Sequence, residues 1–245
     1  ERQALVDLVA RIRPLTAQVP EITTFELMTV LAFLHFFESR VNIAVVEVGL
    51  GGRLDATNII TPLVSVITPI SYDHTAILGN TLTEIAFEKG GIIKAGVPVV
   101  ISPQNPEAER ELVRIAAERG SSLTRVEQEY RLSILSHSLR GQELAFAAQT
   151  GDPACARSLA CPELNLHLPL LGAHQAQNAR TALGALDQVR AQGLALSRMD
   201  IQKGFGQVEW PARFEILREN PPVVIDSAHN GDSMNCLRQS LDDYF

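Results

Sequence analysis

The sequence predicts an α/β fold with a parallel sheet and a small antiparallel addition. Three short β-branched apolar runs, Ile43–Val48, Val64–Ile70 and Val97–Ser102, are typical of strands that are buried on both faces of a parallel sheet. Segments with helical spacing of apolar residues, such as Pro106–Arg119, alternate with these runs. Between Tyr130 and Leu170 the pattern changes to shorter alternating segments, which favour antiparallel strands with one face in solvent.

Composition limits the classes of function. The chain has 245 residues, enough for one large or two modest domains, and 46% of them are hydrophobic. The net charge of -7 argues against nucleic acid or an anionic membrane as a partner. We expect no membrane association, because the sequence has neither an apolar run of 18 residues nor a signal peptide after Glu1. The three cysteines, Cys155, Cys161 and Cys236, indicate reduced thiols and a cytoplasmic protein.

The first half of the chain alternates helices and strands. A helix is predicted over residues 3–17, and Thr23 or Thr24 resembles the N-cap of a buried helix with Glu26 in its first turn. After it the pattern predicts strands over 43–48 and 64–70, a helix over 82–94, a strand over 97–102, a helix over 106–119 and a strand over 122–125. Gly96 and Gly120 are predicted to end the helical regions 82–94 and 106–119.

The second half predicts fewer strands. Residues 173–192 form an Ala- and Leu-rich helix, and residues 199–205 form a short one. Val208–Pro211 is interpreted as a linker, and Val223–Ile225 as a final buried strand.

Polar side chains follow the first two predicted strands. Glu47 lies at the end of one, while Asp73 and His74 come just after the other. Because ligands of open parallel sheets bind beyond the carboxyl ends of the strands, we expect Glu47 and His74 in one crevice, where both can ligate a divalent cation. The alternatives are that the glycine-turn amides satisfy Glu47 and that His74 caps a helix.

Other polar residues suggest a nucleotide site. His174, Gln175 and Asn178 are spaced to share a helix face, where amides could contact an adenine edge or cap the helix. Asp226 ends a predicted strand, as carboxylates that bind a nucleotide ribose often do. The glycine turn at 49–52 lacks the G-x-G-x-x-G spacing of a dinucleotide fingerprint.

Seven motifs occur in the order found in one enzyme family. They are Thr23–Glu26, Glu47–Asn58, Asp73–Thr75, Glu88–Lys94, Gly172–Gln175 with Asn178, Trp210–Arg213 and Asp226–Asn230. On these motifs the chain resembles the folylpolyglutamate synthase and dihydrofolate synthase family of the Mur ligase superfamily. The resemblance covers nearly the whole chain.

The resemblance implies a fold and its domains. It implies a Mur-ligase-type, P-loop-like ATPase domain over 1–209, with the antiparallel addition at about 130–170. Residues 210–245 would begin a Rossmann-like, glutamate-ligase C-terminal domain. The family's glycine-rich phosphate loop, G-T-x-G-K-[ST], does not occur in these residues. We therefore expect a fragment that lacks this loop and most of the C-terminal domain, and that has little or no activity alone.

The resemblance also implies a reaction and its residues. The family uses ATP and Mg²⁺ to join L-glutamate to a folate, or to dihydropteroate, through an acyl phosphate. The resemblance also implies that this protein is a monomer. The implied metal ligands are Glu47 and His74, and the implied catalytic groups are His74 and Lys89, the latter as N6-carboxylysine. The implied folate-binding residues are Thr23, Thr24, Phe25, Glu26, Leu54, Asp55 and Ala56, and the implied ATP contacts are Asn178, Arg213 and Asp226.

Two other interpretations stay open at this point. Without a phosphate loop, the chain could be a non-catalytic remnant that binds folate or a partner. It could also be another Mur-type amide ligase with a different acceptor, although the Thr-x-Phe-Glu and Leu-Asp-Ala motifs argue against that. For Lys89 the plain alternative is a surface lysine at a helix end, and for Phe25 it is a core residue.

Overall fold

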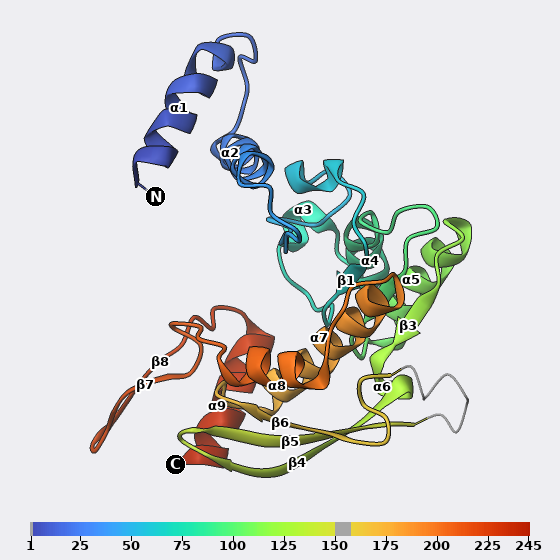
Figure 1. The fold of residues 1–245 in the computed structure, drawn as a ribbon, viewed down its shortest axis with the longest axis vertical. Coiled ribbons are helices and arrows are strands. Elements are labelled where there is room, and N and C mark those ends of the chain that lie inside the picture. Colours follow the sequence, from blue (N-terminus) through green and yellow to red (C-terminus); the bar gives the residue numbers. More distant parts are fainter. Residues whose placement is uncertain (1, 150–157) are drawn as a thin grey trace. The chain divides into compact units, whose positions relative to one another are not determined.

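The computed structural model describes residues 2–149 and 158–245 (Figure 1). The chain divides into two compact units, Glu1–Thr61 and Pro62–Phe245, called here the first and the second unit. Part of the predicted antiparallel segment, residues 150–157, lies outside the described residues, and so does the thiol of Cys155. Among the described residues, neither Cys161 nor Cys236 takes part in a disulfide.

The first unit contains two helices and one turn of 3₁₀ helix. These are α1 (Arg2–Thr16), α2 (Thr24–Glu38) and η1 (Ala56–Ile59). Thr23 is the N-cap of α2, and Thr23 and Glu26 form a capping box, which confirms the predicted helix start. Leu8, Ile12 and Leu31 form the small core where α1 meets α2.

Two predictions for the first unit were wrong. Helix α2 is not buried, since Phe37 is 81% exposed and Met28 is 59% exposed. The run Ile43–Val48 is not a strand, and Val45 is 94% exposed. The reason is that no strand of the described residues pairs with this run, so its backbone amides and carbonyls lack a ladder to join.

The second unit contains the predicted parallel sheet. Its strands are β1 (Ser65–Ile67), β2 (Val99–Ile101) and β3 (Leu123–Arg125), in the order β1-β2-β3 and all parallel. Helices α3 (Thr75–Leu78), α4 (Leu82–Gly90) and α5 (Pro106–Glu118) occur between these strands, and α6 (Val126–Glu129) follows β3. The strands are shorter than the apolar runs that predicted them, because each pairs over only three residues.

The central strand β2 divides two hydrophobic cores. Val99 and Ile101 belong to the core that includes α4 and α5, while Val100 belongs to the core that includes helix α7 (Ala173–Ala191). This alternation follows from the two-residue period of a strand, and all three side chains are almost fully buried. Each contributes about 1.5–3 kcal/mol by leaving water.

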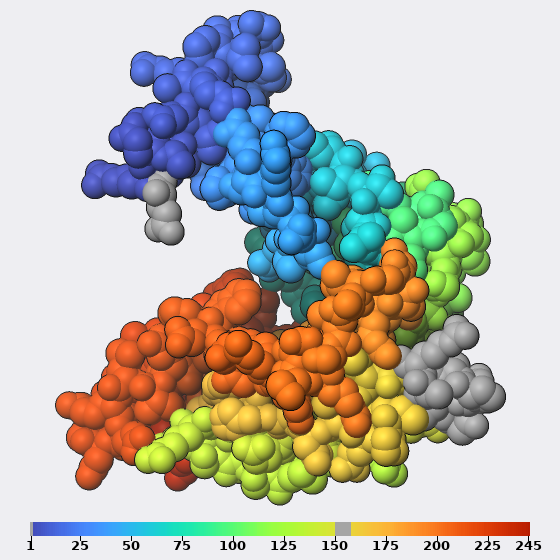
Figure 2. Space-filling model, in the orientation of Figure 1, coloured from blue at the N-terminus to red at the C-terminus, as the bar shows by residue number. Residues whose placement is uncertain are grey.

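The predicted antiparallel addition is confirmed. It consists of β4 (Tyr130–Ser138), β5 (Gly141–Ala148) and β6 (Leu164–Leu168), in the order β4-β5-β6. Along β6 buried and exposed residues alternate, so one face packs on the core and the other faces solvent. Helix α8 (Arg198–Gly206) lies against β6, seen as the orange and yellow surfaces that adjoin in Figure 2.

The chain continues with a hairpin and a helix. Strands β7 (Glu215–Glu219) and β8 (Pro222–Ile225) pair antiparallel, and α9 (Gly231–Tyr244) follows. The prediction that Val223–Ile225 is buried was wrong, since Ile225 is 43% exposed. In the described part of the chain this hairpin has no third strand. Among the described helices, none combines the length and the apolar character that crossing a membrane requires.

Candidate functional site

The start of α2 presents an aromatic ring beside a glycine turn. The capping box uses the polar groups of Thr23 and Glu26, with the Glu26 carboxylate accepting from Thr23 N at 2.7 Å and from Thr23 Oγ1 at 2.8 Å. These bonds, that from the backbone first, lower the pKa of Glu26. Phe25 is 42% exposed, and its ring lies so close to Gly49 that a Cβ there would be 2.4 Å from Phe25 Cζ. Only glycine leaves the ring this room.

Phe25 also lines a groove of the first unit. The groove has a volume of 280 Å³, and side chains of α2 and of residues 45–47 form its walls. Its surface is mainly apolar and aromatic, and Glu47 contributes a carboxylate. A ligand with a flat ring and a polar end would fit such a surface.

Asp55 holds the glycine turn together. Its Oδ2 accepts from the amides of Gly49 and Leu50, both at 3.0 Å, and its Oδ1 accepts from Thr57 N at 2.9 Å and Thr57 Oγ1 at 2.5 Å. Partial burial raises the pKa of Asp55, but these hydrogen bonds outweigh it and lower the pKa overall. The glycine-turn amides therefore bind Asp55, whereas the sequence alternative assigned them to Glu47. Leu54, beside it, is 79% exposed and accessible to a ligand.

The second unit places Lys89 near the Asp73–His74 turn. Lys89 is partly buried in the last turn of α4, and burial lowers the pKa of its ammonium while the negative charge of Asp73 partly offsets the shift. A lowered pKa favours the neutral amine from which N6-carboxylysine would form. The partial burial does not agree with a fully solvated surface lysine.

His74 has an unusual backbone conformation. Its φ is +48°, in the left-handed region that few non-glycine residues adopt. Its amide donates to Asp73 Oδ1 at 2.8 Å, and its Nε2 lies 3.8 Å from the same oxygen. Although His74 stands at the N-cap position of α3, its side chain makes no capping hydrogen bond, so the capping alternative was wrong. The imidazole is 55% exposed and accessible to a ligand.

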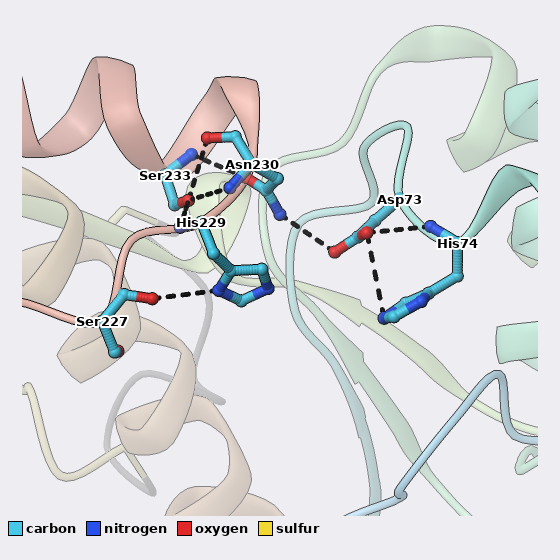
Figure 3. Close-up of polar contacts among 6 residues, drawn as sticks. All are labelled: Asp73, His74, Ser227, His229, Asn230 and Ser233. Atoms are coloured by element: carbon cyan, nitrogen blue, oxygen red, sulfur yellow. Dashed lines mark hydrogen bonds and ion pairs between the residues drawn. The ribbon is translucent and has the colours of Figure 1, made fainter.

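A distant segment reaches this turn. Asn230 Nδ2 donates to Asp73 Oδ2 at 2.9 Å across 157 residues of sequence, as Figure 3 shows. Nearby, His229 Nδ1 lies 2.9 Å from the carbonyl oxygen of Ser227. In the sequence Asn230 is the last residue of the motif Asp226–Asn230, and nothing local identifies Asp73 as its partner. Its role as N-cap of α9 was readable, because Asn230 and Ser233 have capping-box spacing.

Charged groups gather beside this segment. Asp226 Oδ2 accepts from Phe214 N at 2.8 Å, and Asp226 Oδ1 accepts from Ala228 N at 2.7 Å. Arg213 is exposed and donates to the hydroxyl of Ser227. Burial lowers the pKa of His174, with Asp226 opposing the shift and Arg213 adding to it, so these three side chains act on one another electrostatically.

Asn178 lies one turn along α7 from this group. It is exposed, and its Nδ2 donates to Gln175 Oε1 at 3.1 Å, which confirms that the two amides share a helix face. The second unit thus brings Lys89, Asp73 and His74 together, and separately groups Arg213, Asp226 and His174. Asn230 and the 226–230 turn connect the two groups.

The described residues contain no group of three or more His, Cys, Asp or Glu side chains that could hold a metal ion. Of the two predicted ligands, Glu47 belongs to the first unit and His74 to the second. Both side chains are of types that bind divalent cations. Their joint binding of one ion stays a prediction.

Comparison with protein families places most of the chain in one domain type. The Mur ligase middle domain matches residues 5–186. The dihydrofolate synthase/folylpolyglutamate synthase of Bacillus subtilis is 36% identical over 226 residues, covering 91% of this chain and 50% of that protein. The folylpolyglutamate synthase of Lacticaseibacillus casei is 34% identical over 249 residues, covering 99% of this chain and 56% of that protein.

Solved structures agree with these relatives. A folylpolyglutamate synthase in complex with AMPPCP and folate superimposes with a TM-score of 0.88 at 34% identity, covering 98% of this chain and 58% of that one. The Thermotoga maritima folylpolyglutamate synthase gives a TM-score of 0.82 at 31% identity, covering 100% and 55%. The chain thus spans about half the length of the relatives that it matches.

Proposed function

The chain belongs to the Mur ligase family and, within it, to the folylpolyglutamate synthase and dihydrofolate synthase group, and from this premise we propose that it serves ATP-dependent ligation of L-glutamate to folates. The observation that carries the proposal is the hydrogen bond of 2.9 Å between Asn230 and Asp73. It brings two of the matching motifs to one place, next to Lys89 and the Arg213–Asp226 group.

The reaction we propose has two steps. A carboxylate oxygen of the folate attacks the γ-phosphorus of ATP, which forms an acyl phosphate and releases ADP. The amine of glutamate then attacks the acyl carbon, the carbon–oxygen bond breaks, and inorganic phosphate leaves as the amide forms. Because negative charge builds up on phosphate oxygens in both steps, the protein must supply cationic groups and hydrogen-bond donors.

Arg213, Asp226 and Asn178 are the proposed ATP contacts. The exposed guanidinium of Arg213 can donate two parallel hydrogen bonds to phosphate oxygens. Asp226 follows strand β8 in a turn that its own carboxylate stabilises, and it is the candidate for the ribose hydroxyls. Asn178 offers an exposed amide for the adenine edge.

Glu47 and His74 are the proposed Mg²⁺ ligands. When bound, Mg²⁺ would neutralise phosphate charge in the reaction. Asp73 accepts a hydrogen bond from the His74 amide and thereby fixes the backbone position from which the imidazole extends. We further propose that Lys89 reacts with carbon dioxide to form N6-carboxylysine, which requires a neutral amine. The lowered pKa of Lys89 favours that neutral form.

The folate is proposed to bind at the groove of the first unit. Phe25 lines the groove and offers a half-exposed ring for the pterin or aryl group. Leu54, which is exposed, and Ala56 are further proposed folate contacts, from the segment that follows the glycine turn. Asp55, Thr23 and Glu26 belong to the proposed folate-binding set through the glycine turn and the helix cap that their side chains stabilise. Thr24 is exposed at the start of α2 and completes the proposed folate-binding set.

The acceptor, the compartment, the oligomeric state and the domain limits are proposed from the family as well. Reduced folate is the proposed acceptor and dihydropteroate a second one, in a cytoplasmic, monomeric protein. Residues 1–209 would provide the central ATP- and folate-binding domain, and residues 210–245 the start of the glutamate-ligase domain.

Incorporation of labelled glutamate tests the proposal. The complete polypeptide, given ATP and Mg²⁺, should convert tetrahydrofolate or dihydropteroate with a turnover of about 1 per second or more. The 245 residues alone should be inactive or nearly so, because they contain no G-x-x-x-x-G-K-[ST] phosphate loop. Incorporation at the full rate by the 245 residues would contradict that expectation.

A matched pair of variants tests the metal ligand. Glu47→Gln in the complete polypeptide should abolish Mg²⁺-dependent activity, whereas Glu143→Gln should not, since Glu143 pairs with His167 on the antiparallel sheet. Full activity of Glu47→Gln would remove Glu47 from the site. If the complete polypeptide binds folate yet transfers no glutamate to any acceptor, the non-catalytic alternative holds.

A further inference from the structure

The hydrogen bond between Asn230 and Asp73 connects two turns that each precede a helix. Asp73 lies in the turn before α3, and Asn230 is the N-cap of α9. Figure 3 shows the Asn230 amide and the Asp73 carboxylate pointing at each other across the space between the two segments. The contact between Nδ2 and Oδ2 measures 2.9 Å, which is normal for a hydrogen bond to a carboxylate.

Asp73 uses both carboxylate oxygens. While Oδ2 accepts from Asn230, Oδ1 accepts from the His74 amide at 2.8 Å. The His74 backbone is left-handed, a conformation that a non-glycine residue keeps only when its surroundings hold it. A change in the position of Asp73 is therefore transmitted directly to His74.

Asn230 is equally constrained. Its Oδ1 accepts from Ser233 N at 2.9 Å, and Ser233 Oγ accepts from the amides of Asn230 at 3.0 Å and His229 at 3.1 Å. The helix cap fixes the oxygen of the Asn230 amide, and the Nδ2 group then points toward Asp73. The protein's own hydrogen bonds thus position the Asn230 side chain.

The other end of α9 is also anchored. Gly172 N donates to Tyr244 Oη at 3.3 Å, and Ser240 is 1% exposed. A Cβ at Gly172 would lie 2.6 Å from Ser240 Oγ, so the start of α7 packs closely on α9. Helix α9 is therefore held at one end by the His74 turn and at the other by the start of the helix that carries Asn178.

We propose that Asn230 is a positioning residue, which aligns the His74 turn with the Asp226 turn through its hydrogen bond to Asp73. The inference rests on the proposed function, in which His74 ligates Mg²⁺ and Asp226 contacts ATP. Asn230 touches neither. It sets the distance between the two groups that must act on the same MgATP.

Variants that keep the helix cap isolate this role. In Asn230→Ser the hydroxyl still accepts from Ser233 N, but the donor to Asp73 is lost. In Asn230→Asp the cap is kept as well, and a second carboxylate faces Asp73. The swap Asn230→Asp with Asp73→Asn restores the bond in reverse, since the new amide at position 73 keeps an oxygen for the His74 amide and donates with its nitrogen. Ser197→Ala, which removes the capping box of α8, is the control for a weakened cap elsewhere.

The first readout needs no substrate. Amide hydrogen exchange of residues 74–79 in the complete polypeptide should be about 10-fold faster in Asn230→Ser and in Asn230→Asp than in wild type, and near wild type in the swap. Unchanged exchange in both single variants would overturn the inference. This result does not depend on whether the protein is a ligase.

The second readout is ligation. The kcat for glutamate incorporation should fall about 10- to 100-fold in Asn230→Asp, and the Mg²⁺ concentration for half-maximal rate should rise, with the KM for folate unchanged. The swap should recover at least about 10-fold of the loss, and Ser197→Ala should behave as wild type. A swap no better than Asn230→Asp, or a loss confined to the KM for folate, would overturn the inference. Absence of ligation in the wild type would instead refute the proposed function, and hydrogen exchange alone would then decide the role of Asn230.

Discussion

The contact between Gly49 and Phe25 allows a steric test of the folate site. In Gly49→Ala the new Cβ would lie 2.4 Å from Phe25 Cζ, 2.7 Å from Cε2 and 3.0 Å from Cε1. Carbon atoms in contact are normally about 3.5–4.0 Å apart, so the ring must move by about 1 Å or more. The φ of Gly49 is not positive, so alanine brings no backbone strain and the whole effect arises from the ring.

The expected magnitudes follow from the exposure of the ring. Because Phe25 is 42% exposed, it can turn into solvent, and the loss of unfolding free energy should be about 1 kcal/mol, at the low end for overpacking. If the ring stacks on folate, its displacement should remove about 0.5–1.5 kcal/mol of binding, roughly a 2- to 10-fold higher Kd. The Kd for MgAMPPCP should not change.

The assay is calorimetric titration of folate into four proteins: wild type, Gly49→Ala, Phe25→Ala and the double variant. Gly49→Ala should raise the Kd for folate in the wild type but not in the Phe25→Ala background, because the ring is then absent. Gly204→Ala, where a Cβ meets nothing within 4 Å, is the control and should leave the Kd unchanged. An equal effect of Gly49→Ala with and without Phe25 would refute the stacking role of the ring.

Three further changes test the structure elsewhere. Asp187→Ala leaves Tyr130 Oη, Ser158 Oγ and Leu159 N without their acceptor and should lower the unfolding free energy by about 2–4 kcal/mol in denaturant titration; a loss below about 1 kcal/mol would contradict this network. Asp55 has a lowered pKa in the folded chain, so its contribution is complete above the unfolded value near about 3.9 and is lost as pH falls through the folded pKa. Asp55→Ala should therefore destabilise by about 2–3 kcal/mol at about pH 7 and much less at about pH 2.5, whereas an equal loss at both would count against it. Lys89 has a lowered pKa in the folded chain, so the unfolded chain binds more protons and the free energy of unfolding rises with pH toward about 10. Lys89→Met should therefore raise the Tm at about pH 7 and flatten the rise of stability with pH. A lower Tm would show that the attraction of Asp73 for the ammonium exceeds the cost of burying it.

The sequence by itself determined the local structure where local rules suffice. The helix start at Thr23 or Thr24, the helix from Pro106 and the alternating strands after Tyr130 were all predicted, because caps, periodicity and turns depend on neighbouring residues. The family motifs likewise identified the ligase group from residues in order along the chain.

Only the tertiary structure decided what distant segments do to each other. The apolar run Ile43–Val48 was predicted as a strand, yet strand formation needs a partner for its backbone groups, and the sequence pattern does not reveal whether one is present. The amides of the glycine turn donate to the carboxylate of Asp55, although Glu47 carries the same charge and was the acceptor considered from the sequence. Asn230 and Asp73 meet across 157 residues because the sheet and α9 place their turns together, and the identity of a hydrogen-bond partner at that separation is set by packing rather than by local sequence.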